Sequence, residues 1–141
     1  MSENTLSYQR ALIHLMVLIS ASDSEMTDHE LASIGQAVRQ LPIFNTYDEA
    51  MLPATAEACA QILQDDDGLD TVLGLVKDEL PAELIETAYA LACQIAAVDG
   101  NLSQEELRLL EMVRHTLHID RLNAAAIERG VGALFHPGLE N

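Results

Sequence analysis

Apolar residues recur along this chain at spacings of three and four, which is the period of an amphipathic α-helix. Two stretches carry the clearest stripes and predict helices at residues 5–21 and 81–98. Both are apolar almost all round, so we expect each to be a buried, central element. The stripe positions are Tyr8, Leu12, Leu15 and Ile19 in the first stretch and Leu84, Ala88, Leu91, Ile95 and Val98 in the second.

Five further helices complete the prediction, at residues 27–41, 47–64, 69–79, 103–117 and 120–129. Pro42 is expected to end the first of these and Gly130 the last. Pro81 suits a first helical position, where the missing N–H costs nothing. No segment alternates with period two and β-branched residues, so the prediction contains no sheet. The C-terminal tail either packs through Leu134 and Phe135 or frays.

The two long apolar helices belong to an internal repeat. Residues 12–34 align without a gap with residues 88–110, and six of the 23 aligned positions are identical. The sequence therefore predicts a single all-α domain over residues 1–141, with about seven helices in two halves related by a pseudo-two-fold axis. The related repeats lie at about 8–41 and 84–117.

Two acidic residues recur at matching places in the repeat. Asp23 and Asp99 follow the two apolar helices, and Glu30 and Glu106 open the helices that come next. A carboxylate at a helix C-terminus opposes the macrodipole, and a bound cation would offset that repulsion. If the two copies pack about their pseudo-axis, the four carboxylates converge, and hard cations such as Ca²⁺ or Mg²⁺ prefer oxygen ligands of this kind. These four residues form the candidate metal site.

A purely structural interpretation of the two glutamates stands beside the metal hypothesis. Thr27 and Ser103 each precede a glutamate by three residues, which is the spacing of a capping box. On this interpretation the hydroxyl and the carboxylate satisfy backbone amides at the start of a helix. Asp23 and Asp99 have no comparably complete structural role. Hydrophobic staples are expected beside both caps, pairing Met26 with Leu31 and Leu102 with Leu107.

Charge and cysteine content narrow the classes of partner. The formal net charge is −16, from 23 acidic residues against 7 Lys and Arg, which excludes direct nucleic-acid binding and favours cations or a basic protein partner. The apolar run at 11–19 is far shorter than the roughly 20 residues of a membrane span, so no direct membrane insertion is expected. Cys59 and Cys93 are isolated and predict buried free thiols; with no basic region at the N-terminus, they indicate a cytoplasmic protein.

The repeated helix and turn resemble the TerB-like family, named for tellurite-resistance proteins. The match lies in two copies of an apolar helix followed by D-G-x-(Leu or Met)-(Ser or Thr)-x-x-E, loosely over residues 8–119, with Ser24 in place of the glycine in the first copy. The resemblance implies an all-α fold of about seven helices in two related halves, a link to stress responses, no enzymatic activity, and a metal-binding role for the repeated acids. These acids map onto Asp23, Glu30, Asp99 and Glu106.

Two other groups of polar residues could hold a metal. Glu111, His115 and His118 fall at i, i+4 and i+7 of one predicted helix, but such a set is more often a solvated face. The aspartate run at 65–67 either binds Ca²⁺ weakly or forms a solvated loop that complements the N-terminus of the next helix. The sequence contains no glycine-rich phosphate loop, nucleophile elbow or HExxH motif.

The sequence therefore predicts a non-enzymatic, TerB-like binding module in a stress-response context. Its expected ligand is a divalent cation, Ca²⁺ or Mg²⁺ before others, and no other cofactor is expected. The alternative is an acidic scaffold or interaction domain that recognises a basic protein partner.

Overall fold

The computed structural model describes residues 3–21, 27–98 and 102–139. Within these ranges the chain is helical and contains no strand, which confirms the predicted all-α fold. Three short 3₁₀ helices occur, η1 (Pro42–Phe44), η2 (Glu49–Met51) and η3 (Ala82–Leu84). The α-helices are α1 (Glu3–Ser20), α2 (Asp28–Gln40), α3 (Leu52–Leu63), α4 (Gly68–Glu79), α5 (Ile85–Ala97), α6 (Gln104–Thr116) and α7 (Arg121–Leu134).

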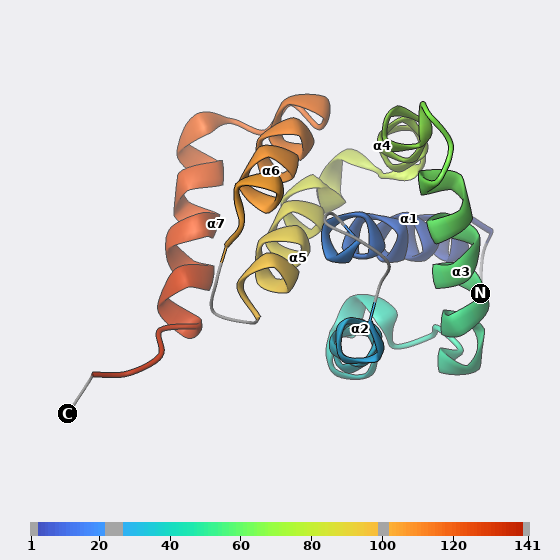
Figure 1. Ribbon diagram of the computed structural model, residues 1–141, viewed down its shortest axis with the longest axis horizontal. Helices are drawn as coiled ribbons and strands as arrows, with labels where there is room; N and C mark the ends of the chain where they lie inside the picture. Colours follow the sequence, from blue (N-terminus) through green and yellow to red (C-terminus); the bar gives the residue numbers. More distant parts are fainter. Residues whose placement is uncertain (1–2, 22–26, 99–101, 140–141) are drawn as a thin grey trace.

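Helix α1 crosses the middle of the molecule and packs against α2, α3, α4 and α5 (Figure 1). Every residue from Ala11 to Ser20 is buried except His14, which is half-buried. Helix α5 packs against α1, α6 and α7, and α7 is the outermost helix on that side of the molecule (Figure 1). The two helices that are apolar almost all round are therefore the central ones, as predicted, and they contact each other.

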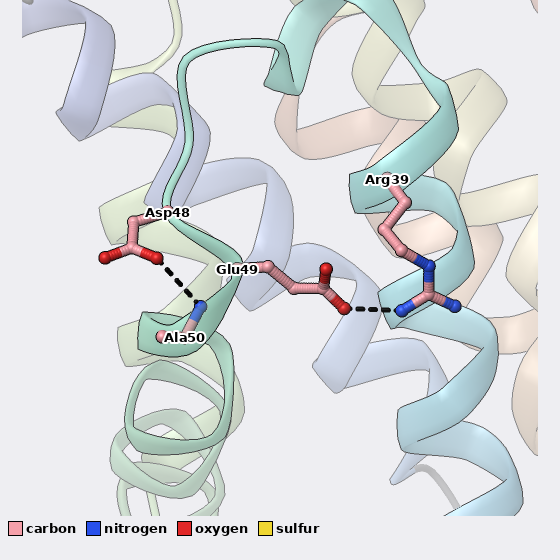
Figure 2. A network of polar contacts seen from close by, with 4 residues as sticks. All are labelled: Arg39, Asp48, Glu49 and Ala50. Carbon is pink, nitrogen blue, oxygen red and sulfur yellow. Dashed lines mark hydrogen bonds and ion pairs between the residues drawn. The ribbon is translucent and has the colours of Figure 1, made fainter.

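Two predicted helix starts were too early. Helix α3 begins at Leu52 because Asp48 instead caps η2, accepting a hydrogen bond from the Ala50 amide at 3.0 Å. Glu49 also forms an ion pair with Arg39 of α2, so this turn is tied to the neighbouring helix (Figure 2). Before α5, Pro81 is the extended residue that precedes η3 rather than a first helical residue. Both segments form a turn of 3₁₀ helix before the α-helix begins.

The predicted end of the last helix was wrong. Helix α7 continues through Gly130 and Gly132 to Leu134. A glycine inside a helix costs about 1 kcal/mol relative to alanine but ends it only where the chain turns left-handed, and here only Gly138 has a positive φ among the described glycines. Val131 packs against the core and holds the extra turns in place. Leu134 is 82% exposed and does not anchor the tail, whereas Phe135 is half-buried.

The turn between α3 and α4 depends on a glycine. Gly68 is the first residue of α4, and a Cβ atom there would lie 2.1 Å from the Ile62 carbonyl oxygen. Any other residue at this position would push the two helices apart. Asp67 is the N-cap residue of α4, but its side chain makes no capping hydrogen bond. The aspartate run is exposed, as expected for a solvated loop.

One buried polar side chain fixes the chain beyond α2. Gln9 of α1 is fully buried, and its Nε2 donates to the Ile43 carbonyl oxygen and to Thr46 Oγ1, both at 3.1 Å. These bonds hold η1 and the following loop against the central helix. A buried amide group that lacks a hydrogen-bond partner costs roughly 1–3 kcal/mol. Arrangements of the loop that break the bonds to Gln9 Nε2 are therefore disfavoured.

Replacing a central leucine will test the burial of α1. Leu12 has no exposed surface, so Leu12→Ala should lower the free energy of unfolding by about 2–5 kcal/mol through lost burial and a residual cavity. Leu134→Ala makes the same chemical change at a side chain that is 82% exposed, and it should change stability by less than about 0.5 kcal/mol. Urea unfolding followed by circular dichroism measures both. Equal losses in the two variants would contradict the assigned core.

Protonation of His14 should weaken the fold. Burial lowers the pKa of His14 below its ordinary 6.5, Glu79 partly opposes this, and Arg10 adds to it. The unfolded chain therefore binds more protons as the pH falls below about 6.5, and protonation favours unfolding. The wild type should lose more stability than His14→Gln between pH 7 and pH 5. Urea unfolding across this range, with His29→Gln as the exposed-histidine control, tests the difference; parallel curves for wild type and His14→Gln would refute it.

Candidate functional site

The structure describes two of the four predicted site residues. Glu30 lies in the first turn of α2 and Glu106 in the first turn of α6, and both are half-buried. Asp23 and Asp99 fall outside the described residues. The geometry of the candidate site therefore comes from the two glutamates and from the helices that carry them.

Both glutamates take part in complete capping boxes, as predicted. In the first copy, Thr27 Oγ1 accepts from the Glu30 amide at 3.1 Å, and Glu30 Oε1 accepts from the Thr27 amide at 2.8 Å. In the second copy, Ser103 Oγ accepts from the Glu106 amide at 3.1 Å, and Glu106 Oε1 accepts from the Ser103 amide at 3.0 Å. The repeat in sequence is thus a repeat in local structure, because the same side chains satisfy the same amides.

The capping role constrains what the glutamates can do chemically. Each capping bond uses Oε1, and each carboxylate sits at the positive end of its helix, where a negative charge is stabilised. Among the residues with described placement, no three His, Cys, Asp or Glu side chains gather closely enough to hold a metal ion. Helix α2 packs mainly on α1, η1 and η2, whereas α6 packs on α1, α4 and α5. Glu30 and Glu106 therefore belong to two turns with largely different surroundings.

The two leucines of the second predicted hydrophobic staple are more exposed to solvent than expected. Leu102 is 47% exposed and Leu107 is 45% exposed, so this predicted staple pair is only partly covered. In the first copy Leu31 packs against the core, and its predicted partner Met26 lies outside the described residues. The two copies thus share their caps but differ in how their apolar side chains are covered.

The predicted histidine face on α6 does not form. Helix α6 ends at Thr116, and His118 adopts a positive φ of 56° beyond it. His118 therefore leaves the helical face that Glu111 and His115 occupy, and no metal group is found there within the described ranges. The predicted helix end at 117 was nearly right, but the proposed face counted His118 as helical, and the chain turns at His118 before α7.

A polar cluster that the sequence did not reveal lies between α5 and α7. Tyr89 is buried, and its hydroxyl donates to Glu128 Oε2 at 2.5 Å. Burial, and next the bond to Glu128, raise the pKa of Tyr89, so the phenol keeps its proton. The partners are 39 residues apart on different helices, so no local pattern could have paired them.

Both cysteines are free and buried, as predicted. Burial raises the pKa of the Cys59 thiol to about 12 and that of the Cys93 thiol to about 11. A protonated thiol is a poor nucleophile, so neither cysteine is activated for covalent chemistry. The thiols act as small apolar groups in the core.

The described elements define a helical domain built on two central helices, α1 and α5, each followed along the chain by a helix with a complete capping box. A family model described as tellurite resistance protein TerB matches residues 9–129. The chain therefore belongs to the TerB family. Comparison with curated proteins and with solved structures found no match. None of the helices in the described ranges has the length and apolar character needed to cross a bilayer.

Removing the capping hydroxyls should weaken both halves. Thr27→Ala and Ser103→Ala should each lower the free energy of unfolding by about 1 kcal/mol, because an amide at the start of α2 or α6 loses its acceptor. Ser33→Ala is the control, since that hydroxyl bonds only to the His29 carbonyl within α2, and its loss should be nearly neutral. Chemical denaturation measures all three. If Thr27→Ala and Ser103→Ala lower the free energy of unfolding no more than Ser33→Ala does, the capping boxes do not stabilise the helices.

Proposed function

We propose that this TerB-family chain is a non-enzymatic binding module whose ligand is a divalent cation, held at the turns that follow α1 and α5. The observation that carries the proposal is the repeated pair of acids in the sequence, in which an aspartate precedes Glu30 and Glu106 by seven residues in each copy. The aspartates of these turns are Asp23 and Asp99.

The donor chemistry of these residues fits a hard cation. Carboxylate oxygens are the ligands that Ca²⁺ and Mg²⁺ prefer. The turns also follow the C-terminal, negative ends of α1 and α5, which attract a cation and are destabilised by an unneutralised aspartate. Asp23, Glu30, Asp99 and Glu106 would hold the ion, and the ion would supply charge neutralisation rather than catalysis.

The acidity of the chain supports the same proposal at longer range. A net charge of −16 raises the concentration of cations near the surface. The second candidate function, recognition of a basic protein partner, draws on this charge too. The family name connects the chain with tellurite resistance, and we propose a stress-response role in the cytoplasm, where the two free thiols stay reduced.

Cation titration of paired variants will test the site. Ca²⁺ or Mg²⁺, added at constant ionic strength, should raise the melting temperature of the wild type, because binding to the folded state alone adds about 2.7 kcal/mol at a hundredfold excess over Kd. Asp23→Asn with Asp99→Asn should abolish the shift. These positions are preferred to the glutamates, whose replacement would also break the capping boxes.

A control variant with the same change in charge distinguishes binding at a specific site from general electrostatic attraction of cations to the acidic protein. Asp65→Asn with Asp66→Asn removes two carboxylates from the exposed turn between α3 and α4 and should leave the shift unchanged. If millimolar cation shifts the wild type and the Asp23/Asp99 variant equally, the cation proposal fails. Binding of a basic peptide that persists in chelator would then favour the interaction domain.

A further inference from the structure

Helix α7 is held to the rest of the molecule along one side only. Among the described helices it packs substantially against α5 alone, and it is the outermost helix on its side of the molecule (Figure 1). The side that faces α5 carries Ala124, which is buried, and Ile127 and Val131, which are half-buried against the core. The other side of this 14-residue helix is therefore open to solvent.

A row of uncharged residues runs along the open side of α7. Ala126 and Gly130 lie about 120° or more round the helix from Ala124, so the row does not face α5. Its two end residues are leucines with 79% and 82% of their surface exposed. The members of this row, called the α7 row below, are Leu122, Ala126, Gly130 and Leu134, at successive spacings of four.

Nothing within the described part of the chain accounts for the glycine in the α7 row. Glycine inside a helix is unfavourable relative to alanine, and the usual reason to keep one is the close approach of another backbone. A Cβ atom added at Gly130 would meet no atom of a neighbouring element within 4 Å. The space beside Gly130 is therefore available to a helix from outside the chain.

The α7 row is complementary to itself in the antiparallel direction. Its members are placed symmetrically about residue 128, so two antiparallel copies set each leucine opposite a leucine and Ala126 opposite a glycine. Rows of residues four apart are the ridges that interdigitate when two helices cross at about −50°. The small residues then meet at the crossing point, and the leucines fill the space where the helix axes diverge.

The distribution of charge favours a second copy of the chain at this face. Residues 121–139 contain only three Asp, Glu, Lys or Arg residues, two arginines and one glutamate, whereas the rest of the chain carries 22 acids against five Lys and Arg. Two copies that met through another surface would bring excess negative charge together. A basic partner would gain more from the acidic surface elsewhere than from the uncharged α7 row.

We propose that the α7 row is a homodimer interface, at which a second copy of this chain packs antiparallel through its own α7. Two-fold symmetry makes this contact isologous, so the assembly closes at two copies. One pair of crossing helices buries less than the roughly 1,600 Å² of a standard interface, and we expect a weak dimer with a Kd of about 0.1 mM. The α7 row includes none of the four acids of the cation proposal and does not depend on them.

Sedimentation equilibrium of the full chain in the presence of chelator will test the dimer. The chain should pass from monomer to dimer between about 10 µM and about 1 mM. Raising the salt concentration from about 0.05 M to about 0.5 M should strengthen the association several-fold, because salt screens the repulsion between two copies of net charge −16. A contact between opposite charges would weaken instead.

Two glycine variants separate the interface from the stability of the fold. Gly130→Gln should weaken association by about tenfold or more, because the side chain blocks the close approach of the two helices. Gly132→Gln is the matched control, since Gly132 is equally open but lies outside the α7 row. It should leave the Kd unchanged. Neither variant should lower the melting temperature of the monomer, because glutamine favours a helix more than glycine does.

A spin label tests the antiparallel arrangement. Asn123→Cys places a label beside the α7 row, and the two native cysteines are buried and stay unlabelled. Mixed with ¹⁵N-labelled wild type, the labelled chain should broaden the amide signals of residues 131–135 more than those of residues 121–125. Stronger broadening at residues 121–125 would contradict the arrangement.

The proposal is overturned if the chain stays monomeric at about 1 mM in high salt, or if Gly130→Gln and Gly132→Gln associate alike. Shifts of the α7 amides on adding anionic phospholipid vesicles or a basic amphipathic peptide to a chain that stays monomeric would assign this face to another partner. That result would equally overturn it. Because chelator is present throughout, failure of the cation proposal cannot produce any of these results.

Discussion

The fold depends on burying two helices that have no polar face. Between Ala11 and Ser20 only His14 of α1 retains substantial contact with water, so neighbours must cover this helix on every side. Helices α2, α3, α4 and α5 provide most of that cover, and α6 also contacts α1. Helix α5 is also apolar almost all round and is covered by α1, α6 and α7. Because each central helix is a neighbour of the other, the contact between α1 and α5 joins the two halves.

The features that the sequence predicted correctly are local or compositional. A helix that is apolar all round must be buried whatever surrounds it, so the central place of α1 and α5 could be predicted without knowing their partners. A capping box needs only residues three positions apart, so Thr27 with Glu30 and Ser103 with Glu106 could be identified from spacing alone. The repeat strengthened both predictions, because the same local solution occurs twice.

The features that the sequence did not predict are set by tertiary contacts. Gly130 is typical of a helix end, but packing of Val131 against the core carries α7 past it. His118 continues the periodicity of α6, yet the chain turns there to reach α7. Tyr89 and Glu128 pair across 39 residues. Convergence of the four acids also depends on tertiary contacts, and it stays a prediction because Asp23 and Asp99 lie outside the described residues.

The two central helices are covered to different extents, and this difference leaves leucines exposed beside the second one. Helices α2, α3, α4, α5 and α6 all contact α1, and among these α3 and α4 have no counterpart in the internal repeat. On its outer side α5 has only α6 and α7, and these do not pack extensively against each other. Leu31 and Leu107 occupy the same position in the two copies and show this difference. Leu31 packs against the core, whereas Leu107 is 45% exposed. The repeated unit therefore keeps its caps in both copies, whereas the second copy leaves more apolar surface accessible to water because fewer elements cover it.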